Sequence, residues 1–287
     1  MKSIIALLRN GEAGFGLISV LLFVLLISAA IAPLAIAGRV QTLSAAYTHE
    51  RREFEVLAEG LARTIFILNV NEKPLVRWQR CETERYVFYL DVQDQRGLVD
   101  LNSASLQLLQ FGFRAVGLNE AGAIAATTVA ERYRSPSGGG VADGSAVDLK
   151  HAPFEDVSEL ADISGAETIS TGRIPRIFTV FNQTDTVASR HVDSQLRQVI
   201  EAGRGSEFLA ENGDSSVSEV SIARVRKGRP SGFMFRAMME RAGEEGDGAR
   251  MLRRSLSVVD EGDLGVPLSG NAPCGGVAEP LIRSYDP

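Results

Sequence analysis

The run FGLISVLLFVLLISAAIAPLAIA, residues 15–37, decides the fold of this chain. It contains no charged residue, and it follows a short leader that carries Lys2 and Arg9 and ends at Gly14. In a helix these 23 residues, at about 1.5 Å each, would extend roughly 34 Å, whereas a hydrocarbon core is about 30 Å thick. The run is therefore expected to form one membrane-spanning helix.

Three kinds of membrane segment are compatible with this run. A secretory signal peptide has an apolar core of about 7–15 residues and a small-residue cleavage site such as residues 35–37, but this run is too long for it. A plain single-pass anchor fits the basic leader, which places the N-terminus in the cytoplasm and the bulk of the chain outside. The third possibility depends on the junction between Gly14 and Phe15, where the leader meets the apolar run.

This junction resembles the N-terminus of type IV prepilin-like proteins. The resemblance implies that a prepilin peptidase cuts between Gly14 and Phe15, that Phe15 is then methylated, and that the helix serves as anchor and assembly surface. The family usually has Glu at the fifth mature residue, where this chain has Ser19. A carboxylate in an apolar helix is costly unless it is paired. Within the family, the minor pseudopilins of the K class in type II secretion lack it.

The helical pattern continues beyond the apolar run. Between Val40 and Leu68 the large apolar residues recur mostly at steps of three and four, which is typical of an amphipathic helix. Asn69, Asn71 and Pro74 end the pattern. We therefore expect one long helix over residues 15–68, whose second half packs on a sheet or a partner.

Residues 101–205 have the pattern of a helical region. LNSAS at residues 101–105 precedes predicted helices that open at Leu106 and cover residues 121–134, 154–160 and 193–201, with Asn102 or Ser103 as the first N-cap. Residues 177–181 are expected to form a short strand before the last of these helices. The order resembles both the helical domain of K-class minor pseudopilins and the tandem helix-hairpin-helix of competence-type DNA receptors. Those receptors have a Gly-x-Gly turn that cradles a phosphate, whereas the turns at 116–119 and 163–166 each have one Gly. Residues 101–200 carry a net charge of −3, which favours a protein scaffold over a DNA site.

The remaining segments predict a small antiparallel sheet. Residues 85–92 are rich in β-branched and aromatic residues, and residues 217–225 are another candidate strand. Residues 233–240 and 252–258 alternate between apolar and polar, with a Gly-rich connector between them. The fold class is thus expected to be α+β, with a pilin-like long helix on the sheet and an inserted all-helical, SAM-like domain. The expected segments are the leader (1–14), the membrane part of the long helix (15–37) and its outer part (38–70). They are followed by the first part of the sheet (71–100), the helical insertion (101–205), the second part of the sheet (206–262) and an irregular tail (263–287).

Two cysteines, Cys81 and Cys274, both lie on the expected outer side. In an oxidising compartment they could form a disulfide that closes a loop of nearly 200 residues, and the chain-entropy model then gives a stabilisation of up to about 5 kcal/mol. The alternative is two unpaired thiols, because the sequence gives no proximity.

Catalytic and metal motifs are absent from the sequence. There is no nucleophile elbow, Walker loop or HExxH, and the three histidines are scattered. The acidic residues Asp91, Asp94, Asp260 and Asp263 are weak candidates for Ca²⁺, with solvated turn carboxylates as the alternative. The net charge of −6 argues against general nucleic-acid binding. We therefore expect a protein that is not an enzyme and requires no cofactor.

Taken together, these features make the sequence resemble that of a K-class minor pseudopilin of a type II secretion system. The resemblance implies a single-pass inner-membrane protein whose larger part is periplasmic, and which initiates or caps the pseudopilus with minor pseudopilins of the I and J classes. The alternative is a membrane-anchored DNA receptor of the competence type.

Overall fold

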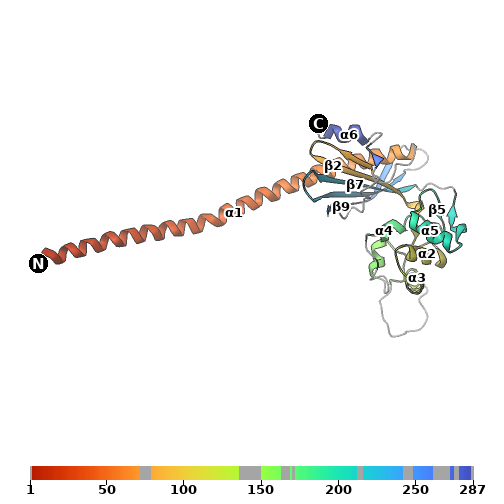
Figure 1. Cartoon of the computed structure of the whole chain (residues 1–287), viewed down its shortest axis with the longest axis horizontal. Coiled ribbons are helices and arrows are strands. Elements are labelled where there is room, and N and C mark those ends of the chain that lie inside the picture. The colour runs from red at the N-terminus through yellow and green to blue at the C-terminus, as the bar shows by residue number, and fades with distance from the viewer. Residues whose placement is uncertain are drawn as a thin grey trace. The chain divides into compact units, whose positions relative to one another are not determined.

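The computed structural model describes residues 2–71, 79–135, 150–162, 169, 172–211, 216–241, 248–260, 272–274 and 278–285. The chain forms two compact units, Met1–Val56 and Leu57–Pro287. Helix α1 (Lys2–Asn71) provides the whole first unit and the first element of the second (Figure 1). Within the described part of the chain, no helix has the length and apolar character that a membrane span requires.

The last turns of α1 belong to the core of the second unit. Ala58, Leu61, Ala62, Ile65 and Phe66 are each at most 4% exposed, and their spacing of three and four places them on one helix face. The stripe predicted from the sequence is therefore buried at this end of the helix.

Six strands form the sheet against which this end of α1 packs. They are β1 (Gln79–Glu82), β2 (Tyr86–Asp94), β7 (Val217–Arg226), β8 (Ser231–Arg241), β9 (Ala249–Asp260) and β10 (Ala272–Pro273), in the order β10-β1-β2-β7-β8-β9. Every pairing is antiparallel except the parallel pair of β1 and β10. The four longer strands lie where alternation and β-branched content predict them.

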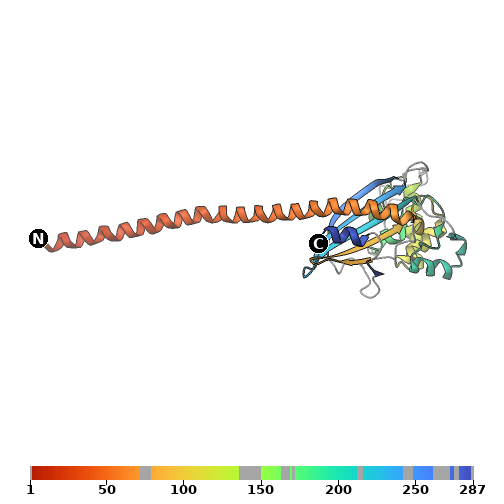
Figure 2. The ribbon, with the colours of Figure 1, turned by 90° about the horizontal axis from the view of Figure 1, so that it is seen from above.

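The two faces of the sheet differ in what covers them. Arg254 of β9 donates to Glu59 of α1 over 2.6 Å, so the face that carries Arg254 is the one that α1 crosses (Figure 2). The strand register puts Leu90, Ile222 and Phe235 on this face, and all three are at most 2% exposed. The opposite face has a separate small core around Tyr89, Ala223 and Met234, and carries polar residues farther along the strands.

A second, larger core lies in the residues between β2 and β7. It is built by the helices α2 (Leu106–Ala115), α3 (Glu120–Arg134), α4 (Ile174–Ile177) and α5 (Ser194–Ala202), with the 3-10 turns η1 (Gln95–Gly97), η2 (Val157–Asp162) and η3 (Ser206–Phe208). Its centre contains Leu101, Leu108, Leu109, Phe113 and Phe178, all at most 1% exposed. Below, residues 95–210 are called the helical region.

The expectation of an all-helical region was wrong in one respect. Short parallel pairs join β3 (Val99–Asp100) to β4 (Phe178–Thr179), and β5 (Val187–Ala188) to β6 (Leu209–Ala210). β4 lies within the short strand expected at residues 177–181. The other three strands were not expected, because each pair brings together segments far apart in sequence, and two-residue strands have no periodicity that a sequence could display.

Three further details correct the sequence predictions. The N-cap of α2 is Ser105, whose hydroxyl accepts from the Leu108 N–H, and not Asn102 or Ser103. The helix expected at residues 154–160 is the 3-10 turn η2. The tail expected to be irregular contains β10 and helix α6 (Ala278–Tyr285), where Ile282 is 1% exposed.

Candidate functional site

The LNSAS segment and its neighbour Asp100 organise the helical region. The Asp100 side chain is completely buried, and its carboxylate accepts backbone N–H groups of Asn102, Ser103 and Gln183, each over 2.8 Å. Since a buried carboxylate needs such donors, Asp100 ties the start of the region to a loop about 80 residues later in the chain.

Asn102 has a bridging role instead of a capping role. Its amide oxygen accepts from the Phe154 N–H over 2.7 Å, and its amide nitrogen donates to the Phe154 carbonyl over 2.9 Å. Arg134, the last residue of α3, donates to the carbonyls of Leu101 and Ala104 at 2.9 and 2.8 Å. The polar residues of this motif therefore hold the helices together, which is a structural task.

The turn between α2 and α3 contains a single glycine. Gly117 has a φ of +112°, and the Leu118 N–H bonds back to the Phe113 carbonyl over 3.1 Å, which closes the end of α2. Gly117 is thus needed for the helix end itself. The second predicted turn, residues 163–166, lies outside the described residues.

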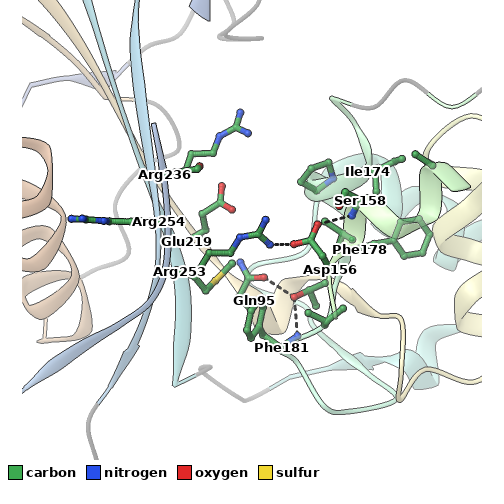
Figure 3. Close-up of a pocket in the computed structure, with 17 residues that line it drawn as sticks. Gln95, Asp156, Ser158, Ile174, Phe178, Phe181, Glu219, Arg236, Arg253 and Arg254 are labelled. Atoms are coloured by element: carbon green, nitrogen blue, oxygen red, sulfur yellow. Dashed lines mark hydrogen bonds and ion pairs between the residues drawn. The ribbon is translucent and has the colours of Figure 1, made fainter. Parts of the chain in front are cut away.

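A cavity of about 240 Å³ lies between the helical region and the face of the sheet opposite α1 (Figure 3). The helical region contributes an apolar wall that includes Val157, Ile174, Pro175, Phe178 and Phe181. The sheet contributes mainly polar and charged side chains from its last three strands: Glu219 of β7, Arg236 and Met238 of β8, and Arg253 and Ser255 of β9. Concave sites with an apolar lining and a few polar groups are typical of ligand pockets.

The charged groups of this cavity fall into two sets. Arg253 forms an ion pair with Asp156, at the entry to η2. Glu219 accepts from the Ser221 hydroxyl over 3.2 Å and interacts electrostatically with Arg236. Burial raises the pKa of Glu219, although the positive charge of Arg236 and the hydrogen bond from Ser221 oppose this effect. The cavity therefore contains a carboxyl group that gives up its proton less readily than an exposed one.

We expect Glu219→Gln to stabilise the protein at pH 8 but not at pH 4.5. Because the pKa of Glu219 is raised in the folded state, the wild type loses stability as the pH rises from the unfolded pKa through the folded one, and Gln does not titrate. Urea unfolding at both pH values measures the difference between the variant and the wild type. An equal difference at the two pH values would show that this carboxyl does not titrate abnormally.

The cavity residues were not found from the sequence. Glu219 lies in the candidate strand at residues 217–225 and Arg236 in the alternating strand at residues 233–240, and the available signal was a charged residue within such a strand. That signal does not say which charged residues share a face, because the sheet register and the position of the helical region decide it.

The predicted cleavage residues Gly14 and Phe15 lie within α1, as does Ser19. The Ser19 hydroxyl donates to the Gly16 carbonyl over 2.9 Å, so the helix satisfies this polar group by itself, which a charged Glu could not achieve in an apolar segment. Cleavage and methylation stay predictions.

The structure joins Cys81 of β1 and Cys274, directly after β10, by a disulfide with a Cα–Cα distance of 4.6 Å. Cys81 is 1% exposed. The bond fastens β10 to β1 at one edge of the sheet.

The acidic residues considered for calcium are not brought to one place. Asp91 and Asp94 are three residues apart in β2 and therefore point to opposite faces, and Asp94 caps η1 by accepting from the Arg96 N–H. Asp260 lies in β9, three strands and about 14 Å from β2. Asp263 lies outside the described residues. Within the described ranges, no group of three His, Cys, Asp or Glu side chains could hold a metal ion.

Comparisons with known proteins give a likeness of structure only. No protein-family model and no curated protein matches the chain. A chain in the crystal structure of the GspK-GspI-GspJ complex from the type 2 secretion system of enterotoxigenic Escherichia coli has a similar fold, with a TM-score of 0.51 and 10% identity. The match covers 76% of this chain and 99% of that chain. It confirms the GspK-like, α+β fold expected from the sequence, and at this identity it shows the fold alone.

Proposed function

We propose that this protein is a minor pseudopilin of the K class, a non-enzymatic component at the tip of a type II secretion pseudopilus. The observation that carries the proposal is the fold likeness to a chain of the GspK-GspI-GspJ complex, which spans nearly all of that chain. Two features of the sequence support the same class independently: the Gly14-Phe15 junction, and the presence of Ser19 where most prepilin-like proteins have Glu.

The exposed apolar surface of α1 supports a role in the membrane and in assembly. Leu17, Leu21 and Leu25 are each more than 60% exposed, and other large apolar side chains up to Ile31 are similarly uncovered. A surface of this kind requires lipid or a partner helix. We infer that residues 15–37 anchor the protein in the inner membrane, with the second unit in the periplasm, until a prepilin peptidase and methylation prepare it for assembly.

The helical region supports a role at the end of the fibre. It has its own core and contains buried hydrogen bonds such as those of Asp100, so it adds a separately packed bulk to the pilin-like part. We infer that it is the inserted SAM-like domain of this class, and that its bulk prevents a further subunit from stacking above it.

In the residues that the structure describes, no observation favours a DNA receptor. The described turn after α2 uses its single glycine to end the helix, and the acidic balance of residues 101–200 opposes phosphate binding.

Partner binding through α1 provides the experimental test. Val40, Leu43 and Tyr47 are exposed on one face of α1 beyond the predicted membrane segment, at helical spacing. The proposal expects the full-length protein to co-purify with the I-class and J-class minor pseudopilins of its own secretion system. Leu43→Glu should weaken this binding about tenfold or more, because the charge would be buried at an apolar interface.

Ala45→Glu is the matched control, since Ala45 is also exposed but lies on the opposite face of the helix. This variant should co-purify like the wild type. If the wild type does not bind the two partners, the assignment to the tip complex is wrong. If the two Glu variants lose binding equally, the interface does not involve the Val40, Leu43 and Tyr47 face.

A further inference from the structure

The two walls of the cavity between sheet and helical region differ in chemistry. One side offers aliphatic and aromatic groups, among them Ile174, Phe178 and Phe181, and the other offers Glu219, Arg236 and Arg253 (Figure 3). A ligand that satisfies both walls needs an apolar part and a charged or polar end.

The charge balance of the cavity indicates the sign of that end. Arg253 is neutralised by Asp156, and Arg254 donates to Glu59 on the opposite face of the sheet, so neither is the main free charge here. In the described part of the chain, Arg236 makes no side-chain hydrogen bond or ion pair, and the residue is exposed. The nearby carboxyl groups are Glu219, whose ionised form is disfavoured by burial, and Asp91 on β2, which acts electrostatically on Glu219. Among the described residues of the cavity, Arg236 is therefore the cation that is available to an anion.

We propose that this cavity binds a carboxylate attached to a small apolar group, with the carboxylate on the Arg236 guanidinium and the apolar group against Ile174 and Phe178. Arg offers a planar pair of donors that matches a carboxylate. The cavity volume of about 240 Å³ is below the usual 300–1,000 Å³ of pockets for drug-sized ligands, so the ligand is small. A short-chain monocarboxylate and the C-terminal residue of a polypeptide share this chemistry. Nothing in the proposed role at the fibre tip requires such a site, so the two proposals are independent, and the failure of one would not affect the other.

Glu219 gives the binding a pH dependence with a definite sign. The groups that face it are Ser221 on its own strand, Asp91 on β2 and Arg236 on β8, with the Asp156–Arg253 pair across the cavity. As the pH falls through the pKa of Glu219, this residue becomes neutral and no longer repels the ligand carboxylate. Affinity should therefore rise on acidification until the ligand itself is protonated, near pH 4–5.

Calorimetry on the full-length protein in nanodiscs tests the proposal with four probes. They are hexanoate, hexylamine, N-acetyl-Leu-Phe with a free carboxylate, and the C-terminal amide of the same dipeptide. At least one carboxylate should bind, and hexylamine and the amide should not. Binding of hexanoate would identify a free monocarboxylate as sufficient, whereas binding of the dipeptide acid alone would identify a polypeptide C-terminus.

Two variants with opposite expected effects make the test specific. Arg236→Gln should weaken binding about tenfold or more through the loss of a charged hydrogen bond. Glu219→Gln should tighten binding at pH 8 and remove its dependence on pH. Arg241→Gln, at the exposed end of the same strand, is the control and should bind like the wild type. Thermal unfolding verifies that each variant is folded. If no carboxylate binds, if the amide binds as tightly as the acid, or if folded Arg236→Gln keeps the wild-type affinity, the proposal is wrong.

Discussion

Replacing Cys274 with Ser is expected to lower the free energy of unfolding by about 3–5 kcal/mol. The bond joins residues 193 positions apart, so its loss releases a very large loop in the unfolded chain. In the folded state it fastens β10 to β1, which pairs with β10 over two residues only. Denaturant unfolding of the oxidised wild type and of the variant measures the difference.

A reducing agent provides the control for this prediction. Reduction should destabilise the wild type by a similar amount and leave the Cys274→Ser variant unchanged, because the variant has no disulfide to break. A loss below about 1 kcal/mol would contradict the account, since it would mean that the bridge contributes little beyond the contacts of the sheet.

Asp100→Ala is expected to destabilise the helical region by about 3–4 kcal/mol. The completely buried carboxylate of Asp100 receives three backbone N–H groups, and hydrogen bonds to charged groups contribute about 1.5–3 kcal/mol each, not additively. Alanine would leave these donors without their partner, and the link between β3 and the Gln183 loop would be lost. Hydrogen exchange of the amides in α2 and α3 should therefore accelerate more than exchange in β7 and β8.

Asp193→Ala is the matched comparison for this prediction. Asp193 is also a carboxylate and accepts the backbone N–H of Gln195, but it caps the exposed start of α5. Its loss should cost about 1 kcal/mol, as is usual for an N-cap. Equal effects of the two Ala variants would show that the burial of Asp100 does not matter.

The elements that the sequence predicted well are those in which a periodic pattern of apolar residues continues over many residues. Alternation in residues 233–240 predicts β8, and the spacing from Val40 to Leu68 predicts the second half of α1. The polar residues of the LNSAS motif were noticed, but their function was assigned wrongly. Asn102 appeared suitable as an N-cap, whereas the structure uses it to bind Phe154, 52 residues away.

The cavity could not be predicted in the same way. Its residues come from three strands and from three segments of the helical region, and no spacing along the chain relates Glu219 to Arg236 or Asp156 to Arg253. The edge strand β10 was not predicted for a similar reason, because it is two residues long and belongs to the sheet only through its pairing with β1. These features depend on pairing between segments that are far apart in the chain, and the local spacing of residues in the sequence does not show such pairing.

The measurement that tests the central claim most directly is the N-terminal residue of the mature protein, purified from the membranes of a cell that carries its secretion system. Mass spectrometry of the N-terminal peptide identifies both the cleavage site and any methyl group. The account predicts a chain that begins at Phe15 and carries an N-methyl group. A chain that begins at Gly38 would mean a secreted protein, and one that begins at Met1 a plain anchor, and either result would contradict the assignment as a pseudopilin.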